Sequence, residues 1–274
     1  DAEPIHPAYA PLIERCEEAV SIAAPARTDA LEFDDGKVMF NWSANLDSID
    51  WTFLVERVGL DRLRSLCARV ETLATINWTN LGGLPSIWRG LRDEVFPTLD
   101  RPPGVFVDLS DPAKRSDADV RTIFEDLGSL NTAAPVTLGL NVSEANRLSS
   151  LALGKTLPSS VSPGAMSDAA ARLHEALGLS AVLVHTRGVV AGAEDGAAVS
   201  VRTRLVGRPV LSTGAGDHFN GGYLAARGRG LGLAESLACG CDTASFYISR
   251  GAAPRLDDLS CFLCSEDGLD REVD

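Results

Sequence analysis

From about residue 72 onward, short apolar runs alternate with longer segments of helical periodicity. Strands that are buried on both faces have this continuous apolar character, and strand–helix alternation joins parallel strands through crossover helices. The expected fold is therefore α/β, with three α/β/α layers and a mostly parallel central sheet, over residues 51–264. The expected strands are 72–78, 104–109, 135–140 and 181–185, with β-like runs in 192–206; the expected helices are 51–58, 60–70, 84–95, 118–130, 143–151, 168–177, 219–226, 234–249 and 256–263.

The first fifty residues do not follow this alternation. Residues 11–21 have the apolar spacing of an amphipathic helix. Two β-forming runs then flank Asp35-Gly36, and aspartate-glycine between such runs is a strong hairpin signal. We assign residues 1–50 to a small β appendage. The end of the chain, 265–274, holds five acidic residues and one Arg, and is expected to be a solvated acidic tail.

The charge balance excludes several classes of partner. The chain has 25 Lys and Arg against 38 Asp and Glu, a net charge of −13, and it contains no basic run. This argues against binding to nucleic acid or to an anionic membrane. No apolar run approaches the roughly 20 residues of a membrane span, and the first residues lack a signal-peptide pattern, so a cytoplasmic location is expected. The chain does not begin with Met, which indicates either processing or a fragment.

The cysteine pattern leaves a zinc site as a minor alternative. Cys239 and Cys241 could join Cys261 and Cys264 as four ligands. The first two lie in a helical pattern, however, where positions two apart point to roughly opposite faces. Reduced thiols that pack as small apolar groups are the better interpretation.

Polar turns follow the expected strands. They are 110–115, the sequence Asn141-Val-Ser-Glu144, and the sequence Thr186-Arg-Gly188. The carboxyl ends of parallel strands meet at one edge of a sheet, which is where open α/β sheets bind ligands. We therefore expect one binding site along this edge.

The stretch 211–222 places small residues before an aspartate at the start of a helix. Gly214, Ala215 and Gly216 can turn their N–H groups toward an anion, assisted by the positive end of the helix dipole. Asp217 would stay ionised there and could accept a proton. An anion cradle beside a base suits phosphoryl transfer to a hydroxyl group. Taken alone, the stretch is equally consistent with a tight turn that has an acidic residue in the first helical turn.

The order of these motifs resembles the ribokinase-like (PfkB) carbohydrate kinase family. The resemblance covers roughly residues 72–263. It is carried by Gly214-Ala-Gly-Asp217 with the following Phe219-Asn-Gly221, by Asn141-x-x-Glu144, by Thr186-x-Gly188, by Asp111-Pro112, and by Gly251-Ala252 after the penultimate helix.

The resemblance implies a ribokinase-like fold and a magnesium-dependent phosphotransferase that moves the γ-phosphate of ATP to an alcohol group of a sugar or related small molecule. It makes Asp217 the base and Gly214, Ala215 and Gly216 the anion hole. It implies that Asn141 and Glu144 hold Mg²⁺ largely through water. Thr186, Gly188 and Asn220 would bind the nucleotide, while Gly251 and Ala252 would line the adenine pocket or a site for a monovalent cation.

The resemblance also makes the hairpin around Asp35-Gly36 a lid over the sugar, through which two copies of the chain could form a homodimer. The family's glycine-rich sugar-binding segment is not visible before the hairpin. The simplest explanation is that about a quarter of an intact enzyme is missing from this sequence.

Several alternatives stay open on the sequence. ADP instead of ATP could be the donor, or the chain could be a nucleotide- or sugar-binding regulatory protein that lost catalysis. A Rossmann-type oxidoreductase would need a glycine fingerprint after the first strand, and none is present. His218 and His185 are both more consistent with structural than with catalytic roles.

Overall fold

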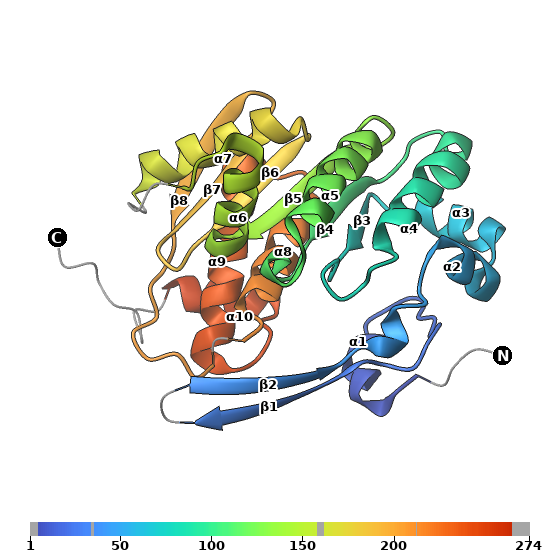
Figure 1. Ribbon diagram of the computed structural model, residues 1–274. Helices are drawn as coiled ribbons and strands as arrows, with labels where there is room; N and C mark the ends of the chain where they lie inside the picture. The colour runs from blue at the N-terminus through green and yellow to red at the C-terminus, as the bar shows by residue number, and fades with distance from the viewer. Residues whose placement is uncertain (1–4, 34–35, 158–161, 212, 265–274) are drawn as a thin grey trace. The chain divides into compact units, whose positions relative to one another are not determined.

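The computed structural model describes residues 5–33, 36–157, 162–211 and 213–264 (Figure 1). Contacts between Cα atoms divide them into two compact units. The first unit comprises the residues up to Val70 together with 77–103, and the second comprises 71–76 together with the residues from Gly104 onward. The first unit thus extends well past residue 50, where the sequence pattern places a boundary.

The second unit is built on a sheet of six strands in the order β3-β4-β5-β6-β7-β8. The first four are parallel to one another, β7 is antiparallel to β6, and β8 is antiparallel to β7. Most residues of β5 and β6 are buried, as expected for strands covered on both faces. The strands are β3 (Thr72–Thr75), β4 (Gly104–Asp108), β5 (Val136–Asn141), β6 (Ala181–His185), β7 (Val189–Glu194) and β8 (Ala197–Arg202).

Helices cover both faces of this sheet, which confirms the predicted three-layer α/β fold (Figure 1). Helices α5, α6 and α7 pack on one face and α8 and α9 on the other. Phe219 and Tyr223 of α8 meet Phe106 of β4 in a buried cluster that also includes α9 side chains. The elements are η5 (Pro112–Lys114), α5 (Asp117–Asn131), α6 (Val142–Leu153), α7 (Pro163–Leu177), α8 (Ala215–Arg227), α9 (Leu233–Arg250) and α10 (Leu256–Cys264).

The first unit combines a two-stranded hairpin with a small helical cluster. The hairpin pairs β1 with β2 from Arg27 opposite Trp42 to Phe33 opposite Gly36, which confirms the predicted hairpin; Asp35 itself lies outside the described residues. Trp88 and Phe96 are fully buried in the helical cluster. The elements are η1 (Pro7–Tyr9), α1 (Ala10–Ile13), β1 (Arg27–Phe33), β2 (Gly36–Trp42), η2 (Ala44–Leu46), α2 (Trp51–Val58), α3 (Leu60–Ala68), α4 (Leu84–Gly90), the π-helix η3 (Leu91–Val95) and η4 (Phe96–Thr98).

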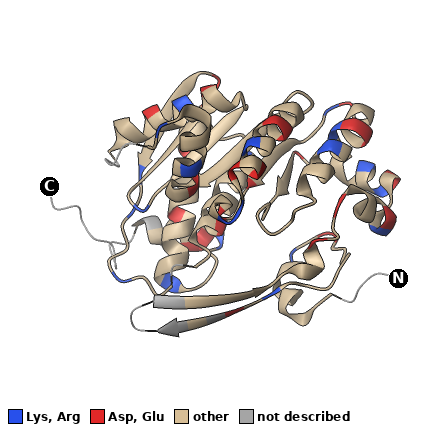
Figure 2. Cartoon of the chain, in the orientation of Figure 1, with Lys and Arg blue, Asp and Glu red and all other residues tan. Residues whose placement is uncertain are grey.

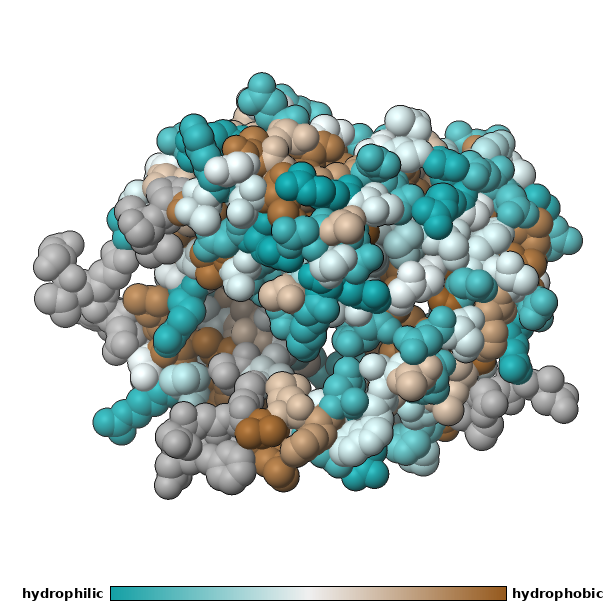
Figure 3. Space-filling view, viewed as in Figure 1, coloured by the Kyte–Doolittle hydropathy of each residue, from teal (hydrophilic) through white to brown (hydrophobic). Residues whose placement is uncertain are grey.

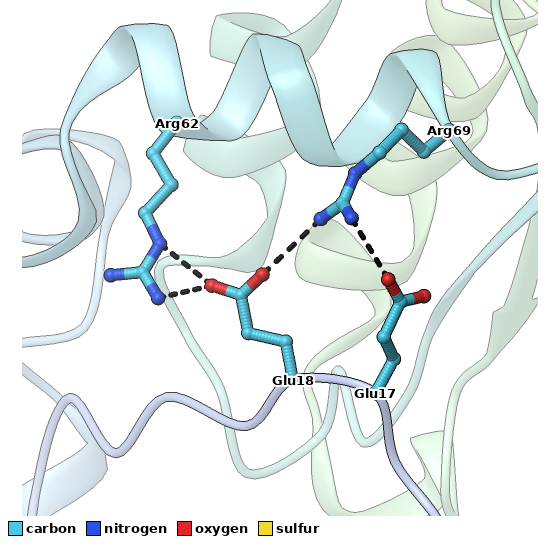
Figure 4. Close-up of polar contacts among 4 residues, drawn as sticks. All are labelled: Glu17, Glu18, Arg62 and Arg69. Carbon is cyan, nitrogen blue, oxygen red and sulfur yellow. Dashed lines mark hydrogen bonds and ion pairs between the residues drawn. The ribbon is translucent and has the colours of Figure 1, made fainter.

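An ion-pair network ties the segment before the hairpin to α3 (Figure 4). Arg62 donates to Glu18 through Nε at 2.8 Å and also through Nη2. Arg69 reaches both acids, at 3.3 Å to Glu17 and 3.2 Å to Glu18. The hydrogen bond from Arg62 lowers the pKa of Glu18. All four side chains are open to solvent, so the network sets the path of the chain more than it stabilises the fold.

Two sequence predictions for local structure are wrong. The helix expected over 11–21 ends at Ile13, because its apolar side is too poorly covered to hold a longer helix, as the 61% exposure of Leu12 shows. The strand expected over 72–78 ends at Thr75, since Asn77 adopts a left-handed conformation with φ of 67° and turns the chain. Among the other helices, α7 begins earlier than expected because Ser162 caps it and Pro163 starts its first turn.

Charged residues concentrate on the helices and are sparse on the strands of the central sheet (Figure 2). Among the described residues, each helix is too short or too polar to cross a bilayer.

Candidate active site

A cavity of about 400 Å³ opens at the carboxyl edge of the parallel strands. Asn141 at the end of β5, Thr186 after β6, and Ala215 and Gly216 at the start of α8 all line it. The structure therefore brings together residues from two of the polar turns, 141–144 and 186–188, and from the start of α8, whereas the turn 110–115 does not line this cavity. Asn220, Gly251 and Ala252 do not line this cavity.

The start of α8 lies at this cavity and carries the N–H groups of the first helical turn. Gly214 caps the helix with φ of 89°, a left-handed conformation that glycine adopts without strain. No hydrogen bond within the described part of the chain uses the N–H of Gly214, Ala215 or Gly216. N–H groups without a partner among the described residues, at the positive end of a 13-residue helix, are chemically suited to an anion.

Asp217 follows these donors in the first turn of α8 and is exposed. It borders a second cavity of about 450 Å³, which Gly221 and Leu256 also line. Desolvation by the surrounding protein raises the pKa of Asp217, the charge of Asp108 raises it further, and His218 lowers it. An accessible carboxylate with a raised pKa is better suited to accept a proton than one of ordinary acidity.

Asp108, at the end of β4, is a site residue whose importance the sequence did not show. Its Oδ1 accepts the N–H of Ser110 at 2.9 Å, and its Oδ2 accepts Nδ2 of Asn220 at 2.7 Å. The first contact caps the loop that follows β4. The second contact comes from Asn220, which is buried at 7% exposure and holds the Asp108 carboxylate in place.

Asn141 and Glu144 form a capping box at the start of α6. Asn141 Oδ1 accepts the N–H groups of Ser143 at 2.9 Å and Glu144 at 3.0 Å, while Glu144 Oε2 accepts the N–H of Asn141 at 2.9 Å. The other oxygen of Glu144 accepts the N–H of Asp111 at 3.0 Å. The chain thus holds the side chains of the Asn-x-x-Glu motif rigidly at the sheet edge.

Glu144 is a buried carboxylate without a cationic partner. It is 6% exposed, and no ion pair within the described residues involves it. Desolvation raises its pKa, as do the charges of Asp108 and Asp111, against the two backbone hydrogen bonds that lower it. A cation would stabilise the buried negative charge of Glu144, so the oxygen atoms of Asn141 and Glu144 fit Mg²⁺. No cluster of three or more His, Cys, Asp or Glu suited to a metal occurs among the described residues, so most ligands would be water and phosphate oxygens.

The turn after β6 supplies a cation that the sequence motifs do not include. Thr186 Oγ1 accepts the N–H groups of Gly188 at 3.2 Å and Val189 at 3.0 Å, which shapes the turn. Arg187 lines the cavity, is exposed, and forms no ion pair with a described residue. Its position between Thr186 and Gly188 was the available signal. Arg204 also lines the cavity, where it pairs with Asp242 at 3.2 Å.

His185 and Gly251 make contacts that are typical of structural residues. Desolvation lowers the pKa of His185 to about 4, so its ring is neutral near pH 7, and it lies 5.0 Å from the ring of Phe219. Gly251 ends α9 in a left-handed conformation and donates its N–H to the carbonyl oxygen of Tyr247. Ala252 follows it beyond the helix end.

The cysteines agree with the non-metal interpretation. All are free thiols, and burial raises the pKa of Cys241 to about 12. A thiol that stays protonated is a poor zinc ligand.

A family model for prokaryotic ketohexokinase matches residues 2–265. A ketohexokinase from Haloferax volcanii is 34% identical over 247 residues, which cover 88% of this chain and 63% of that protein. The chain therefore spans less than two thirds of the length of this relative.

Solved structures of the ribokinase fold resemble the chain at low sequence identity. Ribokinase from Thermotoga maritima has a TM-score of 0.62 at 19% identity, covering 90% of this chain and 71% of its own. Adenosine kinase from Sinorhizobium meliloti has a TM-score of 0.64 at 16% identity, covering 87% of this chain and 65% of its own.

Proposed function

This chain belongs to the prokaryotic ketohexokinase family, and from that membership we propose that it transfers the γ-phosphate of ATP to a hydroxyl group of a sugar. The name of the Haloferax volcanii relative makes a ketohexose the first acceptor to test. The observation that carries the proposal is the juxtaposition, in one helix turn, of the exposed carboxylate of Asp217 and three N–H donors that have no partner among the described residues.

Asp217 is proposed as the general base. It accepts the proton of the acceptor hydroxyl as the hydroxyl oxygen attacks the γ-phosphorus, and the bond to the leaving oxygen of ADP breaks. The N–H groups of Gly214, Ala215 and Gly216 stabilise the charge on the transferring phosphoryl group. Fixed donors of this kind supply much of the rate enhancement in phosphoryl transfer.

Asn141 and Glu144 are proposed to hold magnesium, mainly through its water ligands. When bound, Mg²⁺ neutralises charge on the phosphate oxygens. Their capping-box hydrogen bonds keep both side chains in place before any ligand arrives, which lowers the ordering cost of binding.

The cavity lined by Thr186 and Arg187 is proposed to take the nucleotide, with ATP preferred to ADP as donor. Its size suits a nucleotide, and Arg187 offers a charge to the phosphates. Gly188 donates its N–H to Thr186 Oγ1 and so shapes the turn that holds Thr186 and Arg187. Gly251 and Ala252 are proposed to act from outside this cavity, where the carbonyl end of α9 favours a monovalent cation.

The hairpin is proposed to act as a lid and to pair with a second copy of the chain. Val38, Met39, Phe40 and Trp42 of β2 are each about half exposed, and hydrophobic side chains are visible at the surface there (Figure 3). A two-stranded sheet with open edges is marginal by itself and is a template for strand pairing. Analytical ultracentrifugation of Phe40→Glu against the unchanged protein tests the pairing: the variant is expected to be a monomer and the unchanged protein a dimer.

The kinase proposal is tested with Asp217→Asn in the full-length protein. Loss of a general base is expected to lower kcat by at least about 100-fold while ATP affinity by calorimetry is kept. Asp195→Asn, an exposed residue in the turn between β7 and β8, is the matched control. Unchanged turnover in Asp217→Asn would contradict the assignment, and nucleotide binding by the unchanged protein without turnover on any sugar would favour a regulatory binding protein.

A further inference from the structure

His218 lies directly after the proposed base, and its ring is fixed on both sides. Its Nδ1 is 2.8 Å from the carbonyl oxygen of Gly214. A carbonyl can only accept, so Nδ1 carries the hydrogen. The backbone N–H of His218 donates to the same oxygen at 3.1 Å, so the Gly214 carbonyl is held twice by one residue.

Tyr247, near the end of α9, completes the arrangement. Its ring stacks on that of His218, with centroids 3.5 Å apart and planes 10° from parallel. Its hydroxyl donates to the carbonyl oxygen of Thr213 at 3.2 Å. A Cβ on Gly214 would lie 3.1 Å from this hydroxyl, so the glycine allows the loop to approach the ring closely.

These contacts determine the directions of the N–H groups of Gly214 and Ala215. In a trans peptide the C=O and the following N–H point in opposite directions. The Thr213 carbonyl faces Tyr247, so the N–H of Gly214 points away from that ring. The Gly214 carbonyl faces His218, so the N–H of Ala215 points out of the helix start.

We propose that His218 and Tyr247 are positioning residues for the phosphoryl-binding N–H groups at the start of α8. Neither needs to touch the substrate. They act by holding the carbonyls of two consecutive peptides, and so keep the donors in the orientation that the transition state requires. The inference rests on the proposed kinase function and adds residues that the binding motif does not contain.

The variants separate the ring stack from the hydrogen bonds. Tyr247→Phe keeps the stack and loses the hydroxyl. His218→Phe keeps a ring and loses the Nδ1 donor, whereas His218→Asn keeps a donor near the Nδ1 position. Removal of one such N–H donor costs up to about 10²–10³ in kcat, and a change in the direction of a donor is expected to cost less. We expect kcat to fall about 10-fold for His218→Phe and about 5-fold for Tyr247→Phe. His218→Asn is expected to recover part of the loss.

The decisive measurement compares affinity for ADP with aluminium fluoride, which mimics the transferring phosphoryl group, and affinity for ADP alone. The variants are expected to lose affinity for ADP with aluminium fluoride in proportion to their loss of kcat, and to keep their affinity for ADP alone. Because both residues act on one loop, the double variant His218→Phe/Tyr247→Phe is expected to lose less than the product of the single losses. Tyr9→Phe and His174→Asn, which lie outside α8 and α9, are the controls.

The outcomes distinguish this inference from the proposed function. If the unchanged protein phosphorylates no sugar and does not bind ADP with aluminium fluoride, the proposed function fails and the positioning role fails with it. If the unchanged protein is an active kinase and both ring variants match its kcat and fluoride-complex affinity, the positioning role alone is wrong. An equal loss of affinity for ADP alone would show general damage to the fold and would also overturn it.

Discussion

At the scale of single residues, the site depends on a carboxylate that has no assigned chemical step. Asp108 is held by Ser110 and Asn220. Desolvation is the main cause of the raised pKa of Glu144 and Asp217, and the charge of Asp108 adds to it; at His185 the same charge opposes the desolvation that lowers the pKa. One fixed negative charge therefore shifts the titration of three other ionisable groups in the site. Its effect on Asp217 bears most directly on the reaction, because the base must be ionised to act.

We expect Asp108→Asn to move the acid limb of the pH profile to lower pH. The Asp108 charge disfavours ionised Asp217, so its removal lowers the pKa of Asp217, and the base stays ionised further into acid. The Asn220 amide can rotate to pair with the new side chain, since its Oδ1 has no partner among the described residues. The measurement is kcat/KM for the sugar against pH at saturating ATP. Asp195→Asn is the control, and an unmoved or alkaline-shifted limb would contradict the role of Asp108.

A second residue-scale prediction concerns the donor side. Arg187→Gln removes the cation at the cavity that has no ion-pair partner among the described residues. A charge-assisted contact to phosphate is worth about 1.5–3 kcal/mol, so KM for ATP is expected to rise roughly 10- to 100-fold. Arg172→Gln, which removes the same charge from the exposed side of α7, controls for net charge. An ATP KM equal in the two variants would remove Arg187 from the nucleotide site.

At the scale of elements, the contact between α8 and α9 is set by two glycines. A Cβ on Gly222 would lie 2.4 Å from Thr243 Oγ1 and 2.8 Å from the Cys239 carbonyl. A Cβ on Gly240 would lie 2.7 Å from the ring of Phe219. Any side chain at these positions would push the two helices apart and shift the start of α8. The position of the proposed anion site at the start of α8 therefore depends on this packing.

We expect Gly222→Ala to lower the free energy of unfolding by about 1–3 kcal/mol, the usual cost of overpacking. A methyl group on the neighbouring Gly221 would have no other atom within 4 Å, so Gly221→Ala is expected to raise the free energy of unfolding by about 0.5–1 kcal/mol through helix propensity. Urea unfolding of the two variants beside the unchanged protein measures both signs. Stabilisation by Gly222→Ala as well as by Gly221→Ala would show that the two helices are not in close contact at Gly222.

At the scale of the whole molecule, charge is the dominant feature. The net charge is −13, and acidic side chains are spread over the helices (Figure 2). Like charges on one surface destabilise the compact state, and salt screens them because the Debye length falls to about 3 Å at 1 M. Stability should therefore depend on ionic strength more than it would in a neutral protein.

We expect the thermal midpoint to rise as KCl is increased from about 0.05 M to about 1 M, where screening is nearly complete. A neutral osmolyte at matched osmolarity separates screening from general exclusion effects. Differential scanning calorimetry measures the shift. A midpoint that falls with KCl would mean that surface ion pairs such as Arg62–Glu18 outweigh the net repulsion.

The features that could be predicted from the amino-acid sequence are those encoded in local patterns. The apolar run of β6 is recognisable because a strand buried on both faces needs no polar residue, and the hairpin is recognisable from Asp35-Gly36. The motif around Asp217 specified the family and the start of α8 for the same reason: it is contiguous, and its chemistry follows from residue types in one helix turn.

The distant side chains that complete the site could be identified only from the folded chain. Asn220 holds Asp108 across 112 residues of chain, and Tyr247 reaches Thr213 across 34, and no local pattern marks either pair. The failed helix over 11–21 has the same origin, because an amphipathic pattern forms a lasting helix only where another element covers its apolar face. Local sequence states what an element can do, whereas the register and packing of elements decide what each side chain meets.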